Sequence, residues 1–159
     1  MTIAVQSKPA MQLSALIEKG RKTIERIPLS VPQLLARLAI ANVFWRSGQT
    51  KLANWDITVQ LFQDEYRVPI LPPDFAATMA ASFELGCSAL LAVGLFTRLA
   101  TLPLLGMTLV IQLFVYPNNW PDHLLWTALL VFLFSRGGGA ASANYLLGRL
   151  LRTRSRGSR

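Results

Sequence analysis

The chain has 159 residues, of which 52% are hydrophobic and only 15% are charged, yet its formal net charge is +8. Soluble proteins carry about 25% charged residues, so this composition argues against a soluble globule and favours a one-domain membrane protein whose bases lie in loops and tails. It also disfavours nucleic-acid binding, because no stripe of Lys and Arg is interleaved with aromatic residues. A single cysteine excludes an internal disulfide, and a single histidine leaves no zinc-ligand spacing.

The N-terminal tail, residues 1–30, is predicted to lie on a membrane surface. Residues 1–27 lack a continuous apolar core and a cleavage site, so no cleavable signal is expected. Apolar side chains fall near helical spacing with bases between them, which is typical of a helix on an anionic leaflet. They are Leu13, Leu16, Ile17, Ile24 and Ile27.

Four apolar segments follow, and each approaches the roughly 20 residues that a membrane-spanning helix needs. They run from about 31 to 50, 75 to 96, 99 to 116 and 120 to 135. The second and third must form a tight antiparallel hairpin, and a Pro- and Asn-rich turn joins the third to the fourth. The predicted fold is therefore an all-α, four-helix transmembrane bundle over residues 31–136. Gly48, Gly86, Gly94 and Gly106 are expected to be points of close packing.

Two further amphipathic segments flank these spans. Trp55, Val59, Phe62 and Tyr66 recur at i, i+4, i+7 and i+11, which predicts an interfacial helix that partly covers the outer end of the bundle. The C-terminal tail, residues 137–159, combines leucines with arginines and predicts a second helix on an anionic leaflet. Bases concentrate in both tails, and an even number of spans places both tails on one side, so both termini are predicted to be cytoplasmic.

Charged side chains lie inside two of the spans and mark the candidate site. Arg37 and Arg46 are in the first span and Glu84 is in the second, where a charge near the bilayer centre costs about 2.5–3.5 kcal/mol. With a rise of 1.5 Å per residue, both guanidinium groups could reach Glu84 near the midplane. Asn42, one turn from Arg46, could add a donor. Because two bases against one acid leave a spare positive charge, we expect a pocket for a quinone or small anion, with Glu84 accepting or passing a proton. The alternative is an ion pair that only fixes helix register.

Three more residues each allow two interpretations. Lys51 is either a snorkelling anchor or the rim of the pocket. His123 is either an interfacial residue at a helix start or a proton donor or ligand at the mouth of the pocket. Cys87 is either a core residue or a thiol that exchanges with a partner protein.

The order of short motifs resembles the DoxX family of small bacterial inner-membrane proteins over about residues 33–136. Arg37-Leu38 leads to Ser47-Gly48-x-x-Lys51-Leu52, then to Glu84-Leu85-Gly86 and Gly94-Leu95-Phe96-Thr97-Arg98, and finally to His123-Leu124-Leu125-Trp126. The resemblance implies a multi-pass protein of the bacterial inner membrane, with Arg37, Lys51 and Glu84 as candidate functional positions. Family members are linked to redox work, and one branch resembles a subunit of thiosulfate:quinone oxidoreductase.

The sequence thus favours a redox-accessory membrane subunit that holds a quinone or small anion. No metal or cofactor motif is visible, so electrons would pass to a soluble or membrane redox partner. The alternatives are a non-enzymatic membrane anchor or scaffold for a soluble partner, and a small-solute transporter.

Overall fold

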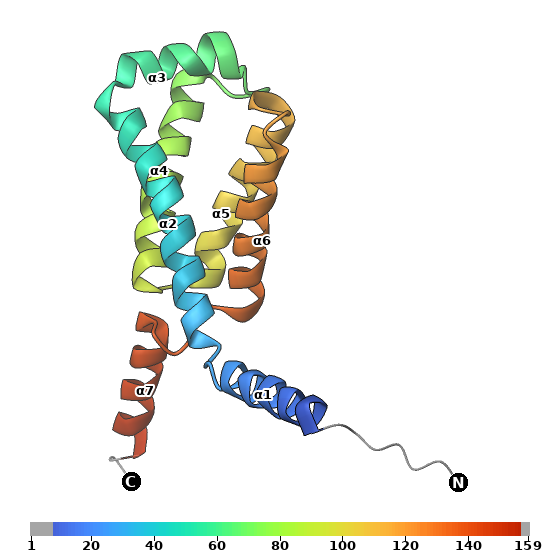
Figure 1. Cartoon of the computed structure of the whole chain (residues 1–159). Coiled ribbons are helices and arrows are strands. Elements are labelled where there is room, and N and C mark those ends of the chain that lie inside the picture. Colours follow the sequence, from blue (N-terminus) through green and yellow to red (C-terminus); the bar gives the residue numbers. More distant parts are fainter. Residues whose placement is uncertain (1–7, 157–159) are drawn as a thin grey trace.

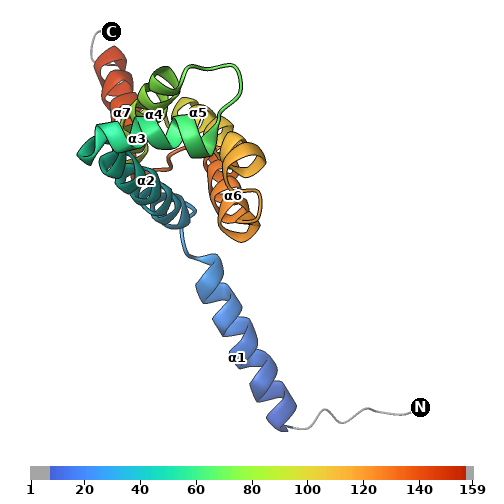
Figure 2. The same ribbon diagram turned by 90° about the horizontal axis from the view of Figure 1, so that it is seen from above.

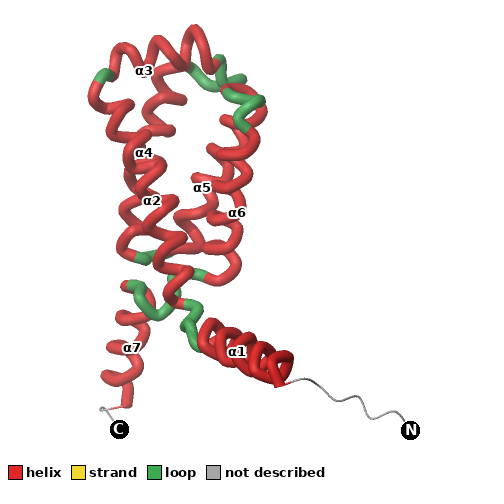
Figure 3. Tube along the Cα trace, in the orientation of Figure 1, coloured by secondary structure: helices red, strands yellow, loops and turns green. Residues whose placement is uncertain are grey.

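The computed structural model describes residues 8–156, and within this range the chain forms helices and no strands (Figure 3). The elements in chain order are α1 (Lys8–Glu25), α2 (Ser30–Ala53), α3 (Trp55–Leu61), η1 (Phe62–Tyr66), α4 (Pro73–Val93), α5 (Thr97–Val110), η2 (Ile111–Val115), α6 (Trp120–Arg136) and α7 (Ala143–Arg156). Here η1 and η2 are short π-helical segments that continue α3 and α5.

Helices α2, α4, α5 and α6 lie side by side and contact one another in a closed order: α2 with α4, α4 with α5, α5 with α6, and α6 with α2 (Figure 1). Helix α3 and η1 lie across one end, called here the loop end. Helices α1 and α7 leave from the opposite end, called here the tail end (Figure 1). Helix α1 points away from the other helices (Figure 2).

The turns form where the sequence predicts them. Helix α4 ends at Gly94, whose φ of +77° is left-handed and suits a residue without a side chain. Phe96 also has a positive φ, and α5 begins at the next residue, so two residues in left-handed conformation reverse the chain. The predicted hairpin between the second and third apolar segments is therefore confirmed.

The amphipathic segment after α2 also folds as its pattern indicates. Phe62 is buried against Ala76, Ala77 and Ala80 of α4, and the partly buried side chains of Trp55, Val59, Tyr66 and Val68 pack against the same cluster. The apolar side of α3 and η1 therefore faces α4, and these two segments cover the loop end.

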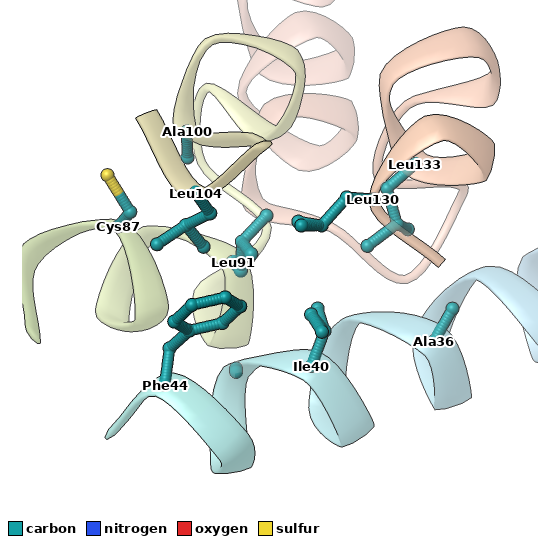
Figure 4. Packing of buried hydrophobic residues seen from close by; sticks show 10 residues of the cluster. Ala36, Ile40, Phe44, Cys87, Leu91, Ala100, Leu104, Leu130 and Leu133 are labelled. Carbon is teal, nitrogen blue, oxygen red and sulfur yellow. The ribbon is translucent and has the colours of Figure 1, made fainter. Parts of the chain in front are cut away.

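The main apolar cluster joins all four packed helices (Figure 4). Ile40, Leu91, Leu104, Leu130 and Leu133 are fully shielded from solvent. Cys87 belongs to this cluster, which agrees with its reading as a core residue.

Only some of the glycines are close-packing points. A Cβ at Gly48 would lie 2.7 Å from Cγ of Leu85, so this glycine brings α2 and α4 together. The expectation fails for Gly86 and Gly106, because no neighbouring atom lies within 4 Å of a Cβ built on either.

The outer surface is strongly apolar and the interior is partly polar. Two helical stretches, 73–93 and 97–115, are long and apolar enough to cross a membrane. Helix α2 carries three bases, and α6 has only 17 residues. All four packed helices expose large apolar side chains, whereas soluble proteins rarely show extended apolar patches. Examples are Leu35, Leu38, Phe75, Val93, Leu99, Leu109, Leu124 and Val131.

Candidate functional site

A buried ion pair between α2 and α4 forms the centre of the candidate site. Lys51 Nζ donates to Glu84 Oε1 at 2.8 Å, and the side chains are 17% and 2% exposed. Ser47 lies one turn before Lys51, so both project from the same side of α2. The Ser47 hydroxyl donates to Glu84 Oε1 at 3.0 Å and accepts from Lys51 Nζ at 2.9 Å. The three side chains therefore form a closed hydrogen-bonded triangle.

This triangle leaves one acceptor and one donor unused. Glu84 Oε2 is buried and has no hydrogen-bond partner among the described residues. Lys51 carries three ammonium protons, and its side chain donates to two acceptors here. A buried carboxylate oxygen without a partner costs free energy, so an unpaired Oε2 beside a spare ammonium proton is suited to a ligand that both accepts and donates.

The triangle faces a cavity of about 630 Å³ at the loop end, between the packed helices and the α3–η1 segment. This is within the range of small-molecule sites, which are mostly apolar with a few placed polar groups. The wall follows that pattern. Its apolar part includes Val43, Phe44, Phe62, Met79, Phe83, Met107, Val110, Ile111 and Trp126, and its polar part includes Ser47, Lys51, Tyr66, Glu84, Tyr116, Asn119 and His123.

His123 supplies a second polar group from α6 and is only 2% exposed. Its Nδ1 lies 2.7 Å from Gln112 Oε1 in η2. The Gln112 amide nitrogen donates to the carbonyl of Pro117 at 2.7 Å, and a carbonyl can only accept, so Oε1 is the atom that faces the histidine. Nδ1 therefore carries a hydrogen and donates to Gln112 Oε1, and in the tautomer without a hydrogen on Nε2 that second nitrogen is an acceptor.

Both π-helical segments border the cavity. Phe62 and Tyr66 of η1, and Ile111 and Val115 of η2, line its wall. Segments of this kind occur frequently at functional sites, because the extra residue per turn redirects side chains. Burial, then the neighbouring phenol of Tyr116, raises the pKa of Tyr66, so this phenol stays neutral at physiological pH.

The predicted pairing of Arg37 with Glu84 is wrong. Arg37 is 1% exposed, but its guanidinium lies at the tail end and donates only to backbone carbonyls in the described part of the chain. The acceptors are Leu91 at 2.8 Å, Ala92 at 2.9 Å, Gly138 at 2.7 Å and Ala141 at 3.0 Å. These four bonds tie α2 to the C-terminus of α4 and to the loop before α7, where carbonyl dipoles favour a cation.

Arg46 and Asn42 also lie outside the cavity. Both are exposed on α2, on a side that does not face α4, and neither lines the cavity. The prediction considered the depth of each base but not its direction around the helix. At 3.6 residues per turn, Lys51 follows Ser47 on the inner side of α2, whereas Arg46 points elsewhere.

Sequence reasoning missed three participants, Ser47, Gln112 and Tyr66. The i, i+4 spacing of Ser47 and Lys51, with Gly48 beside them, could have indicated a shared helix face. The contact between Gln112 and His123 had no sequence signal, because it depends on how η2 packs beside α6. Of the residues predicted for the site, the fold brings Lys51, Glu84 and His123 to one cavity.

The DoxX family model matches residues 33–117, which extend from the first turns of α2 through η2. The match thus includes Ser47, Lys51 and Glu84 and stops before His123. No curated protein and no solved structure matches the chain significantly.

Proposed function

Because this chain belongs to the DoxX family of membrane proteins, we propose that it is a redox-accessory subunit that holds a quinone in the loop-end cavity. The observation that carries the proposal is the unpaired Glu84 Oε2, which lies beside an ammonium group with a spare proton in an otherwise apolar wall.

The proposal places α2, α4, α5 with η2, and α6 across the bacterial inner membrane as a four-helix transmembrane bundle, with residues 31–136 as the membrane domain. The exposed apolar side chains of all four helices would contact lipid. The described parts of the basic tails, residues 8–30 and 137–156, then lie at the cytoplasmic leaflet beside anionic lipids. Helix α3 and η1 lie at the outer interface.

The charges of the triangle favour a neutral ligand over an anion. Lys51 and Glu84 cancel each other, and the charge of Arg37 is satisfied by four carbonyls at the other end of α2. The spare positive charge that suggested a small anion is therefore absent from the cavity, and an anion near Oε2 would be repelled. A quinone ring offers carbonyl acceptors when oxidised and hydroxyl donors when reduced, so it matches both unused groups.

The residues of the chain then have distinct roles. Lys51 donates to a ring carbonyl, and Glu84 Oε2 accepts from a ring hydroxyl and holds its proton. His123 Nε2 offers a second acceptor. When bound, a quinone supplies reversible two-electron chemistry, and a soluble or membrane redox partner exchanges the electrons.

The route into the cavity also fits a lipid-soluble ligand. Gly106 lines the cavity and is itself exposed on α5, so the cavity reaches the surface that would face lipid. A side chain at this position would narrow the cavity without meeting any atom within 4 Å at Cβ.

The test is a titration of the full chain in lipid nanodiscs with decylubiquinone, followed through quenching of tryptophan fluorescence, because Trp126 lines the cavity. We expect saturable quenching that Gly106→Leu abolishes. Gly86→Leu is the matched control, because this glycine is also exposed and uncrowded but does not line the cavity. It should bind like the wild type.

If decylubiquinone quenches both leucine variants equally, the quinone does not bind in the loop-end cavity and the proposal is wrong. If decylubiquinone does not bind the wild type, and deletion of residues 137–159 abolishes recruitment of a soluble protein, the anchor function replaces the present proposal.

A further inference from the structure

A second recess lies at the tail end, between the N-terminus of α5 and the loop that follows α6. Its volume is about 350 Å³, and it shares no lining residue with the loop-end cavity. The lining residues are Phe96, Thr97, Arg98, Leu99, Gly137, Gly138 and Asn144. Arg98 is the one charged residue among them, and none is acidic.

The first turn of α5 borders this recess and has backbone N–H groups that no side chain caps. The helix has no side-chain cap, and its first backbone bond runs from Ala100 N to the Phe96 carbonyl. The N–H groups of residues 97–99 therefore have no acceptor within the helix. Such a helix end carries a partial positive charge and binds phosphate groups well.

The Thr97 hydroxyl is an independent sign that a ligand is missing. Thr97 is 2% exposed, and its Oγ1 has no hydrogen-bond partner among the described residues. This oxygen faces Gly138 on the opposite wall, because a Cβ at Gly138 would lie 2.7 Å from it. Any side chain at position 138 would collide with Oγ1, so a glycine is required where this wall of the recess meets the hydroxyl.

Arg98 adds a full positive charge that is only partly used. Its Nη2 donates to the Ser135 carbonyl at 3.1 Å, and its Nε faces Gly137, 3.6 Å from where a Cβ would lie. One hydrogen bond to a carbonyl leaves most of the five guanidinium N–H groups for another acceptor. The position of Asn144 is fixed by its backbone N–H, which donates to the Gly94 carbonyl at 3.3 Å.

We propose that this recess binds a phosphate group through the α5 N-terminus, the Thr97 hydroxyl and the Arg98 guanidinium. The same phosphate chemistry is found in an anionic phospholipid head group and in free phosphate. Phe96 and Leu99 border the recess and are 56% and 64% exposed, which places apolar contacts beside the phosphate, where an acyl chain would lie. The site goes beyond the proposed quinone function and does not depend on it.

The experiment is native mass spectrometry of the full chain, released from micelles that contain equal amounts of dioleoyl-phosphatidylglycerol and dioleoyl-phosphatidylcholine. The wild type is expected to retain phosphatidylglycerol preferentially. Arg98→Gln should weaken this retention about tenfold or more, as expected for a lost charge-assisted hydrogen bond. Thr97→Val keeps the shape and removes the hydroxyl, and should weaken it about threefold to tenfold.

Arg136→Gln is the matched control, because Arg136 is an exposed base at the same end that does not line the recess. It should change retention by less than about twofold, because its side chain lies outside the recess. Arg98→Lys, which keeps the charge, should recover part of the binding and shows that the Arg98→Gln protein has not merely lost its fold.

A second arm separates the two sources of phosphate by adding 50 mM inorganic phosphate, with chloride at matched ionic strength as the reference. If phosphate displaces phosphatidylglycerol and chloride does not, lipid and free phosphate share the site. If phosphatidylglycerol is retained in the presence of phosphate, the site is specific for lipid. Stabilisation by phosphate without lipid retention supports free phosphate as the ligand. Equal losses in Arg98→Gln and Arg136→Gln, or no loss in either, would overturn the proposal.

Discussion

The Lys51–Glu84 pair gives the sharpest test of the site, because each partner stabilises the buried charge of the other. Removing one partner of a buried ion pair leaves an uncompensated charge and costs about 3–5 kcal/mol. Lys51→Met leaves unpaired a carboxylate whose side chain is 2% exposed, so its loss of stability should be near the upper end of this range. Glu84→Gln leaves unpaired an ammonium group whose side chain is 17% exposed, so its loss of stability should be near the lower end of the range.

The double variant Lys51→Met/Glu84→Gln should be less destabilised than either single variant. It leaves no unpaired charge, and the Ser47 hydroxyl that donates to Glu84 can still donate to the amide oxygen of the glutamine. Replacing a whole buried pair is often close to neutral, so we expect a cost of about 1 kcal/mol. At about 2–4 °C per kcal/mol for a chain of this size, the single variants should melt roughly 6–20 °C below the wild type.

The chain carries its own reporter for this measurement. Cys87 is its only cysteine and is buried, so a thiol-reactive fluorophore reports unfolding directly. Arg46→Met is the matched control, because it removes an exposed base from the same helix and should leave the melting temperature nearly unchanged. If the losses of melting temperature in the two single variants add up in the double variant, the contact between Lys51 and Glu84 is refuted. A large loss of melting temperature in Arg46→Met would instead support the pairing of Arg46 with Glu84 that the sequence suggested.

Two further predictions concern the two ends of the fold. Arg37→Lys should lower the melting temperature although it keeps the charge, because an ammonium group cannot reach the four carbonyls that the planar guanidinium joins. Its decylubiquinone titration at temperatures where it is folded should match the wild type, and weaker binding would contradict the separation of Arg37 from the cavity. The folded-state pKa of Tyr66 is raised above its ordinary value of 10, mainly by burial, so its contribution to stability is complete below pH 10 and decreases as the pH rises further. Melting curves between pH 9 and 11.5 should therefore show a smaller alkaline loss in Tyr66→Phe than in the wild type, and parallel losses would contradict this linkage.

Much of the fold follows from local sequence signals. The four apolar segments predict α2, α4, α5 with η2, and α6 to within a few residues at most ends, because helix length and apolar runs are local properties. The reversal at Gly94 follows from the residue that a left-handed helix end prefers. The i, i+4 pattern of the loop segment likewise predicted which of its sides is apolar and covers the bundle, and the structure places α4 against that side.

The sequence by itself also established that charges lie inside apolar helices and that Glu84 is the acidic residue among them. Only the tertiary structure decided its partner. Depth along a helix can be estimated from residue number, but the choice among Arg37, Arg46 and Lys51 depends on how α2 is rotated against α4. That rotation is set by the close contact at Gly48 and by the carbonyls that hold Arg37 at the tail end, which are contributed by residues 54 to 104 positions further along the chain.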